Sequence, residues 1–126
     1  MKVRAYGCRL KDQDPALSEY VINTVSAGKA RYSYLLHLQD AGWVVNFFDI
    51  AVRSLGEPVQ TPRLDRIARY RSRPELTAGT MVNAEGFVGA IVDADSSCNF
   101  QVLVTEGPRR GSTIHCHPCG ITVLPG

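Results

Sequence analysis

Residues 86–94 read GFVGAIVDA, and this short stretch decides the predicted fold. Successive side chains of a strand point to opposite faces, and here both alternating sets are apolar. Such a run is typical of a strand that is buried on both faces. Gly86 and Gly89 would let the strand bend sharply. We therefore expect a bent strand that belongs to both halves of a small barrel.

Four other short β-segments surround this strand and are separated by turns rich in Gly, Asn and Ser. Closure of such a sheet into a barrel would remove its exposed edges. The sequence therefore predicts a closed five-stranded barrel over residues 77–126. Its strands would be TMVNA, GFVGAIVDA, NFQVLVTE, STIHCH and ITVL.

In the N-terminal half, three segments show the alternation of strands, namely residues 2–8, 19–25 and 46–56. In the third segment we expect Phe48, Ile50 and Val52 to point inward, toward a core. One face of such a sheet must be covered by another layer, because its apolar side chains would otherwise remain exposed to water.

That partner layer is predicted between the second and third segments, where the apolar spacing changes to three and four residues. Ser26 can cap the start of this helix, and Gly42 suits the left-handed conformation in which many helices end. The predicted buried stripe is Ala27, Ala30, Tyr34, Leu35, Leu38 and Ala41. Residues 1–58 thus form a predicted β-β-α-β lobe with the helix on one face of the sheet.

Residues 59–76 are rich in arginine and proline and have no strand pattern. A short helix from Pro62 to Tyr70 would place Leu64, Ile67 and Ala68 on one side and the arginines on the other. We interpret this segment as a connection between two lobes. The predicted fold class is α+β, with a lobe over 1–58, a connecting segment over 59–76 and a barrel over 77–126.

The order of strands and turns after Thr77 resembles the SH3-like barrels of the KOW and Tudor type. The whole chain resembles small uncharacterised proteins of tailed bacteriophages and prophages. The residues that carry this second resemblance are Tyr6-Gly7-Cys8, Leu17 to Val21, Ser26 to Tyr32, Ser96 to Leu103 and Cys116-His117-Pro118. It implies an origin in a bacterial host cell and no catalytic residue.

The composition limits the classes of protein to which the chain could belong. Of its 126 residues, 44% are hydrophobic and 21% are charged, which is ordinary for a folded domain. The first residues lack the apolar core of a secretion signal, and the apolar run 41–48 is too short to cross a bilayer. We expect a cytoplasmic protein that contacts no membrane, with its four cysteines reduced.

The formal net charge of +2 is small, but the positive charge is concentrated. Residues 61–75 hold five arginines against two acids. Arginine guanidinium groups with a tyrosine among them suit phosphate contacts and base stacking. The same groups could instead be solvated or could bind an acidic protein surface. The predicted binding residues in this segment are Arg63, Arg66, Arg69, Tyr70, Arg71 and Arg73.

A second set of predicted binding residues lies in the loops of the barrel. Asn99 follows a polar loop, and Arg109 and Arg110 stand at the tip of the turn EGPRRG. Phe87 and Phe100 are weaker candidates, because phenylalanine is more often a core residue than a contact residue.

The segment HCHPC contains His115, Cys116, His117 and Cys119 and has three interpretations. A structural zinc site needs four tetrahedral ligands, and a second close pair is missing from the sequence. A redox dithiol usually opens a helix, whereas this one leads into a strand. Strand alternation would also send the two histidines to one face and Cys116 to the other. We favour a turn with a buried cysteine, and expect no metal and no cofactor.

No segment of the sequence predicts an active site. Gly28-Lys29 lacks both the preceding glycine and the following Ser or Thr of a phosphate-binding loop, and Ser97 has no base at a known spacing. We therefore expect a protein that is not an enzyme. The first hypothesis is a phage accessory protein that binds nucleic acid. The alternative is a protein that binds and modulates a host regulator, polymerase or defence complex, and the sequence leaves self-association open.

Overall fold

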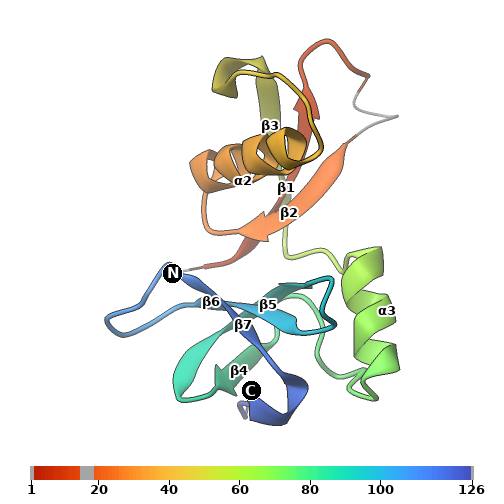
Figure 1. Ribbon diagram of the computed structural model, residues 1–126. Coiled ribbons are helices and arrows are strands. Elements are labelled where there is room, and N and C mark those ends of the chain that lie inside the picture. The colour runs from red at the N-terminus through yellow and green to blue at the C-terminus, as the bar shows by residue number, and fades with distance from the viewer. Residues whose placement is uncertain (1, 15–18, 126) are drawn as a thin grey trace.

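The computed structural model describes residues 2–14 and 19–125 of the chain. Leu17, one residue of the phage resemblance, lies outside the described residues. Within these ranges the fold contains two α-helices and two antiparallel sheets, of three and five strands. Figure 1 shows the smaller sheet with its helix above the larger sheet, and the second helix beside the larger sheet. The predicted α+β class is confirmed.

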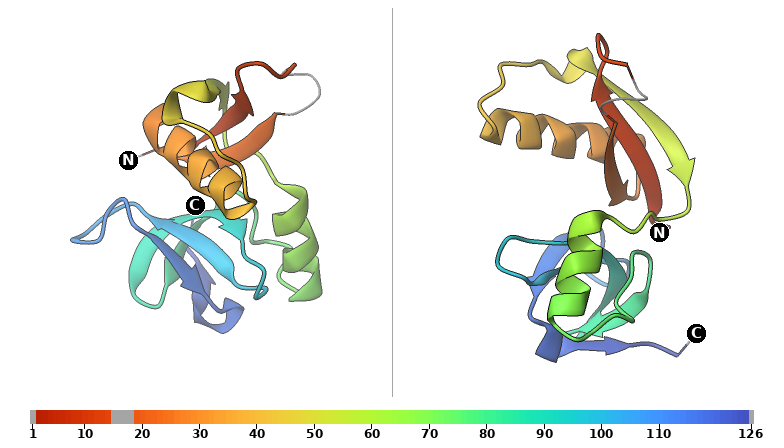
Figure 2. Two further views of the ribbon diagram at one scale, coloured as in Figure 1. Left: turned by 45° about the horizontal axis from the view of Figure 1, so that its top comes forward. Right: turned by 90° about the vertical axis from the view of Figure 1, so that its right-hand side faces the viewer.

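The N-terminal lobe is a three-stranded sheet covered by one helix. Strand β1 (Arg4–Leu10) lies between β2 (Tyr20–Thr24) and β3 (Ile50–Gly56), and both pairings are antiparallel. Helix α2 (Ala27–Asp40) lies across one face of this sheet (Figure 2). The order β-β-α-β is confirmed. The residues buried between the helix and the sheet are Tyr6, Cys8, Leu10, Ala30, Tyr34, Leu38 and Ile50.

The two ends of α2 are set by the residues that the sequence indicated. The Ser26 hydroxyl accepts a hydrogen bond from the Lys29 amide at 3.2 Å. At the other end Gly42 has φ +90°, and the Trp43 amide donates to the Leu38 carbonyl at 2.9 Å. The buried stripe is narrower than predicted, because its two outermost residues, Ala27 and Ala41, lie in the first and last turns and are exposed.

Phe48 does not point inward, so this part of the prediction is wrong. Phe47–Asp49 form a short 3₁₀ turn, η1, and strand β3 begins only at Ile50. The turn is held by the Asn46 amide, which donates to the Asp49 carboxylate at 2.9 Å, and by the Asp49 amide, which donates to the Asn46 carbonyl at 3.0 Å. These local bonds interrupt the alternation, and the Phe48 side chain is 80% exposed.

The C-terminal half forms the five predicted strands. They are β4 (Met81–Ala84), β5 (Phe87–Ala94), β6 (Phe100–Val104), β7 (Thr113–Cys116) and β8 (Ile121–Val123). A short 3₁₀ turn, η2 (Pro118–Gly120), separates the last two. The strand order is β7-β6-β5-β4-β8, so the last strand returns to pair with the first.

The predicted closed barrel is not shown. Within residues 2–14 and 19–125 no pairing joins β7 to β8, so the five-stranded sheet remains open. Helix α3 (Pro62–Tyr70) packs on the apolar face of this sheet (Figure 2). It buries side chains that, in the predicted barrel, other strands would cover. The helix therefore offers another way to cover that face.

Helix α3 follows the predicted pattern but does more than connect two lobes. Thr61 caps it by accepting a hydrogen bond from the Leu64 amide at 3.2 Å. Leu64, Ile67 and Ala68 are buried, as predicted. They belong to a core that the segment 59–76 shares with the five-stranded sheet, together with Leu76, Val82, Ala84, Ile91, Ala94, Phe100, Val102, Cys116 and Ile121. The boundaries 1–58, 59–76 and 77–126 stay a prediction.

Both faces of β5, which are apolar in the sequence, contribute side chains to a core. Ile91 and Ala94 face the core under α3, whereas Ala90 and Val92 belong to a second cluster with Val3 and Leu103. Val3 precedes β1, so this second cluster is shared by the two lobes. The two sheets therefore pack against each other through β5 and its neighbours.

Gly89, the glycine within β5, should be hard to replace. A methyl group at this position would clash with the Leu103 carbonyl oxygen, which belongs to the backbone of β6 and cannot rotate away. We expect Gly89→Ala to lower the free energy of unfolding by about 2 kcal/mol or more, the usual cost of overpacking. Gly28→Ala is the matched control, since nothing lies within 4 Å of its added methyl group and alanine favours a helix. Urea titrations of both variants would measure the difference, and equal stabilities would contradict this account.

Candidate functional site

The candidate site is a groove between the two lobes. Its central part has a volume of about 560 Å³ and lies between β2 and α2 on one side and β5, β6 and β7 on the other. Two smaller hollows continue it, one of about 340 Å³ beside Lys29 and Gly111 and one of about 460 Å³ beside Pro62 and Arg66. Each hollow shares lining residues with the centre, among them Thr113 at the first end and Arg63 at the second. The three hollows therefore form one groove.

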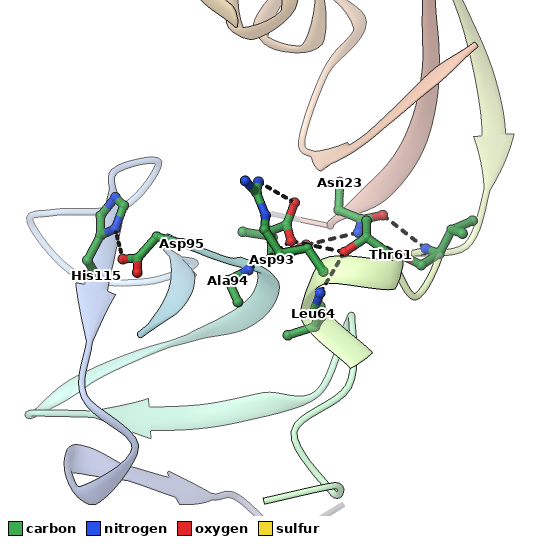
Figure 3. Close-up of polar contacts among 10 residues, drawn as sticks. Asn23, Thr61, Leu64, Asp93, Ala94, Asp95 and His115 are labelled. Carbon is green, nitrogen blue, oxygen red and sulfur yellow. Dashed lines mark hydrogen bonds and ion pairs between the residues drawn. The ribbon is translucent and has the colours of Figure 1, made fainter. Parts of the chain in front are cut away.

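The side chain of Asn23 joins the two lobes beneath this groove. Its amide nitrogen donates to the Val59 carbonyl at 2.9 Å and to the Val92 carbonyl at 3.0 Å, and its oxygen accepts from the Val59 amide at 2.9 Å (Figure 3). Asn23 is on β2, Val92 is on β5, and Val59 leads toward α3. One buried amide thus fixes three segments relative to one another.

Asp93 organises the end of the groove near α3. One carboxylate oxygen accepts from the Thr61 hydroxyl at 2.9 Å and from the Ala94 amide at 2.8 Å, and the other lies 3.3 Å from the Arg63 guanidinium (Figure 3). Partial burial works against the charge of Arg63, but its contact with Asp93 keeps the pKa of this guanidinium above the ordinary value. Arg63 is therefore neutralised by a partner within the protein.

Asp95 and His115 form a second polar pair that faces the groove. His115 Nδ1 lies 2.6 Å from one Asp95 oxygen, while the other oxygen accepts from the backbone amides of Ser97 and Asn99. Partial burial acts to raise the pKa of Asp95, but the hydrogen bonds from His115 and these amides bring it below its usual value. His115 lines the groove. Because Asp95 contacts only Nδ1, the second ring nitrogen of His115 is available to a ligand.

The HCHPC segment forms the predicted turn. Pro118–Gly120 make the 3₁₀ turn η2, and the Cys119 amide donates to the His117 ring at 3.1 Å. Cys116 is 1% exposed, whereas Cys119 and both histidines are exposed. Burial, followed by the nearby Glu85, raises the pKa of the Cys116 thiol. In the described part of the chain no three His, Cys, Asp or Glu side chains are grouped to hold a metal ion.

Two more of the predicted arginines hold the fold together. Arg71 donates to the Cys98 carbonyl at 2.9 Å. Arg73 pairs with Glu75 at 2.6 Å and also donates to the carbonyls of Pro118 and Ile121, at 2.7 and 3.0 Å. These bonds attach the end of α3 to the neighbouring loops of the five-stranded sheet. Their guanidinium groups are committed to contacts within the protein.

The remaining predicted residues of α3 are exposed. Arg69 forms an ion pair with Asp65 at 3.1 Å on the helix surface, and Tyr70 is 73% exposed. Arg66 is also exposed and has no acidic partner among residues 2–14 and 19–125. Of these three residues, only Arg66 lines the groove.

The predicted residues of the sheet loops lie elsewhere. Arg109 and Arg110 are exposed in the turn between β6 and β7, and the Arg109 guanidinium lies 5.4 Å from the centre of the Phe87 ring. This turn and α3 are at opposite ends of the larger sheet (Figures 1 and 2). Asn99 is half-buried beside Asp95, and Phe100 is a core residue with 0% exposure.

The predicted residues therefore do not form one patch: Arg63 and Arg66 line one end of the groove, and Arg110 stands near the other. Arg110 is next to Gly111, whose carbonyl accepts a hydrogen bond from Lys29 at 3.1 Å, and Lys29 and Gly111 line the end opposite Arg66.

Several groove residues were missed by the sequence interpretation. Tyr32 is 56% exposed and Leu36 is 42% exposed on the side of α2 that faces the groove, and the rings of Tyr20 and His37 stack at 4.5 Å. Only the inner stripe of this helix was predicted. The available signal was the spacing of four residues between Tyr32 and Leu36, which places both on one outer face.

Comparison of the chain with family models, curated proteins and solved structures found no match. Neither helix in the described ranges is long and apolar enough to cross a membrane.

Removing the Asn23 amide should be costly. Asn23→Ala would leave the buried Val92 carbonyl and the part-buried amide and carbonyl of Val59 without their partner. We expect the free energy of unfolding to fall by about 2–4 kcal/mol, since each unsatisfied buried group costs about 1–3 kcal/mol. Thermal and urea unfolding would measure the loss. A loss below about 0.5 kcal/mol, the usual effect of a surface substitution, would contradict the assigned role.

The Asp95 interactions should make stability depend on pH. Because the folded state lowers the pKa of Asp95, the stabilisation is present above the ordinary pKa of aspartate and is lost as the pH falls through the lower folded value. We expect Asp95→Asn to be less stable than the parent by about 1–2 kcal/mol near neutral pH. Urea titrations at several pH values should show this difference shrinking in acid. A difference that stays constant down to the acid transition would overturn the prediction.

Proposed function

We propose that this chain is a non-catalytic protein that binds single-stranded nucleic acid in the groove between its lobes. The distribution of charge along the groove carries the proposal. Two acids that line it already have partners in the protein, Glu19 with Arg53 at 2.6 Å and Asp93 with Arg63 at 3.3 Å. Arg66 lines one end of the groove without an acidic partner in the described ranges.

The opposite end carries positive charge as well. Lys29 lines that end, and Arg109 and Arg110 are exposed in the adjoining turn. None of the three forms an ion pair with an acid in the described part of the chain. A phosphate backbone that follows the groove would thus meet guanidinium or ammonium groups at both ends. Asp40, the third acid of the groove lining, lies between these ends.

The aromatic rings along the groove suit bases. Tyr32 is more than half exposed, and the Tyr20–His37 stack lines the central part of the groove. Bases stack on such rings with little sequence preference, because every base has a flat π-face. In a duplex these faces are covered by neighbouring bases, so access to them favours a single strand. His115 and Gln101 on the opposite wall add polar groups that could reach the edges of the bases or the sugars.

Two further statements belong to this proposal. The strand order, in which β8 returns to β4, supports a relation between residues 77–126 and the SH3-like barrels, which bind their ligands through loops. An origin among phage or prophage proteins is consistent with a small nucleic-acid-binding accessory protein that acts in a bacterial host cell.

Fluorescence anisotropy of labelled single-stranded DNA and RNA of mixed sequence, about 20 nucleotides long, would test the proposed function at low salt. We expect binding that weakens steeply with salt, with a slope of about −0.7 for each phosphate contact. Arg66→Ala and the double variant Arg109→Ala with Arg110→Ala should each reduce that slope. Lys2→Ala removes one positive charge, as Arg66→Ala does, and is a control because Lys2 pairs with Glu57 and lines a separate pocket. Absence of binding to both oligonucleotides at low salt would overturn the proposal.

Substitution of two tyrosines shows whether nucleic acid binds in the groove or on the exposed face of α3. Tyr32 lines the groove, whereas Tyr70 is 73% exposed outside it. We expect Tyr32→Ala to weaken binding by about 5- to 150-fold, the range reported by alanine substitution of stacking residues. Tyr70→Ala should change affinity by less than about twofold, as expected for a ring that contacts no base. Anisotropy titrations at one salt concentration would measure both, and the opposite order would place the nucleic acid on α3.

A further inference from the structure

The loop that follows α2 exposes large apolar side chains. Trp43 is 51% exposed, Val44 is 101% exposed and Phe48, in the turn η1, is 80% exposed. We refer to these three residues as the apolar loop. Single exposed apolar residues are common, but two aromatic rings and a valine within six positions are a feature of interaction surfaces.

A hollow lies directly beside the apolar loop. It has a volume of about 430 Å³, and Trp43 and Val44 form part of its wall together with Leu10. Asp49, the neighbour of Phe48 in the chain, also lines it. The surface thus combines an exposed aromatic side chain with a hollow that has an apolar wall, so two copies could each place a side chain in the hollow of the other.

The charges around the hollow identify the kind of partner. Lys11, Asp12 and Asp49 line it, so both signs of charge are present. Lys11 and Asp12 have no ion-pair partner among the described residues. A mixed-sign surface does not favour nucleic acid or an anionic membrane, which both require an excess of positive charge. It is complementary to itself, because a two-fold axis can bring Lys11 of one copy to Asp12 of the other.

We propose that the apolar loop and the charged residues beside it bind a second copy of this chain, giving a two-fold symmetric dimer. The residues that line the hollow are not among those that line the groove between the lobes. Each copy therefore keeps its groove accessible, and the proposal does not depend on the proposed function. The surface is small, so we expect a weak dimer with a dissociation constant on the order of 10–100 μM, as for small transient interfaces.

Sedimentation equilibrium of the full chain from about 5 to 500 μM would test the dimer, because this range spans the expected dissociation constant. We expect the average mass to rise from that of the monomer toward twice that value. Trp43→Ser combined with Phe48→Ser should keep the chain monomeric over the whole range. Tyr70→Ser is the matched control, since Tyr70 is an aromatic residue with comparable exposure on α3 and should leave dimerisation unchanged.

A charge exchange provides the second test. Lys11→Asp alone and Asp12→Lys alone should each weaken dimerisation at least about fivefold, because each brings like charges together across the two-fold axis. The double variant Lys11→Asp with Asp12→Lys should restore dimerisation, because opposite charges again face each other across the two-fold axis. A parent chain that stays monomeric at every concentration would overturn the proposal, and the apolar loop would then be a surface for binding a different protein. Equal dimerisation in the parent and the Trp43, Phe48 variant would also overturn it.

Discussion

The arrangement of the two lobes depends on one buried amide. Asn23 on β2 satisfies the carbonyl of Val92 on β5 and both backbone groups of Val59. The bond to Val92 is buried, so losing it would leave polar atoms unsatisfied between the two sheets. The adjacent apolar cluster of Val3, Ala90, Val92 and Leu103 adds contact area but no direction. The directional bonds of Asn23 therefore determine how the lobes meet and where the groove lies.

The predicted arginines differ in their role: some bind other parts of the protein, and others lie near the groove. Arg63, Arg71 and Arg73 bind carboxylates or carbonyls of the protein and so connect α3 to the rest of the fold. Arg66 and Arg110, which form no ion pair within residues 2–14 and 19–125, lie near opposite ends of the groove. A chain with a small net charge can thus have a locally positive groove, because most of the acids that line the groove are paired with arginines of the protein itself. The apolar loop lies outside this path, so the proposed dimer and the proposed ligand of the groove use separate surfaces.

Short-range patterns determined the secondary structure. The strands and helices of the described residues follow from alternation, from the spacing of three and four and from local end signals such as Ser26, Gly42 and Thr61. Each of these effects acts within a few residues, so the sequence alone contains the information. The error at Phe48 has the same origin: alternation was extended across residues 46–49, where a competing local turn forms.

Tertiary structure alone decided the site and the openness of the larger sheet. Asp95 and His115 are 20 positions apart, and Asn23 and Val92 are 69 apart, so no local pattern pairs them. Which arginines remain free likewise depends on which carbonyls and carboxylates the folded chain brings near them. The sheet stays open although its strands were predicted correctly, because the apolar face is covered by α3, which precedes it in the chain. Competition between distant segments for the same apolar surface is settled only when the whole chain packs.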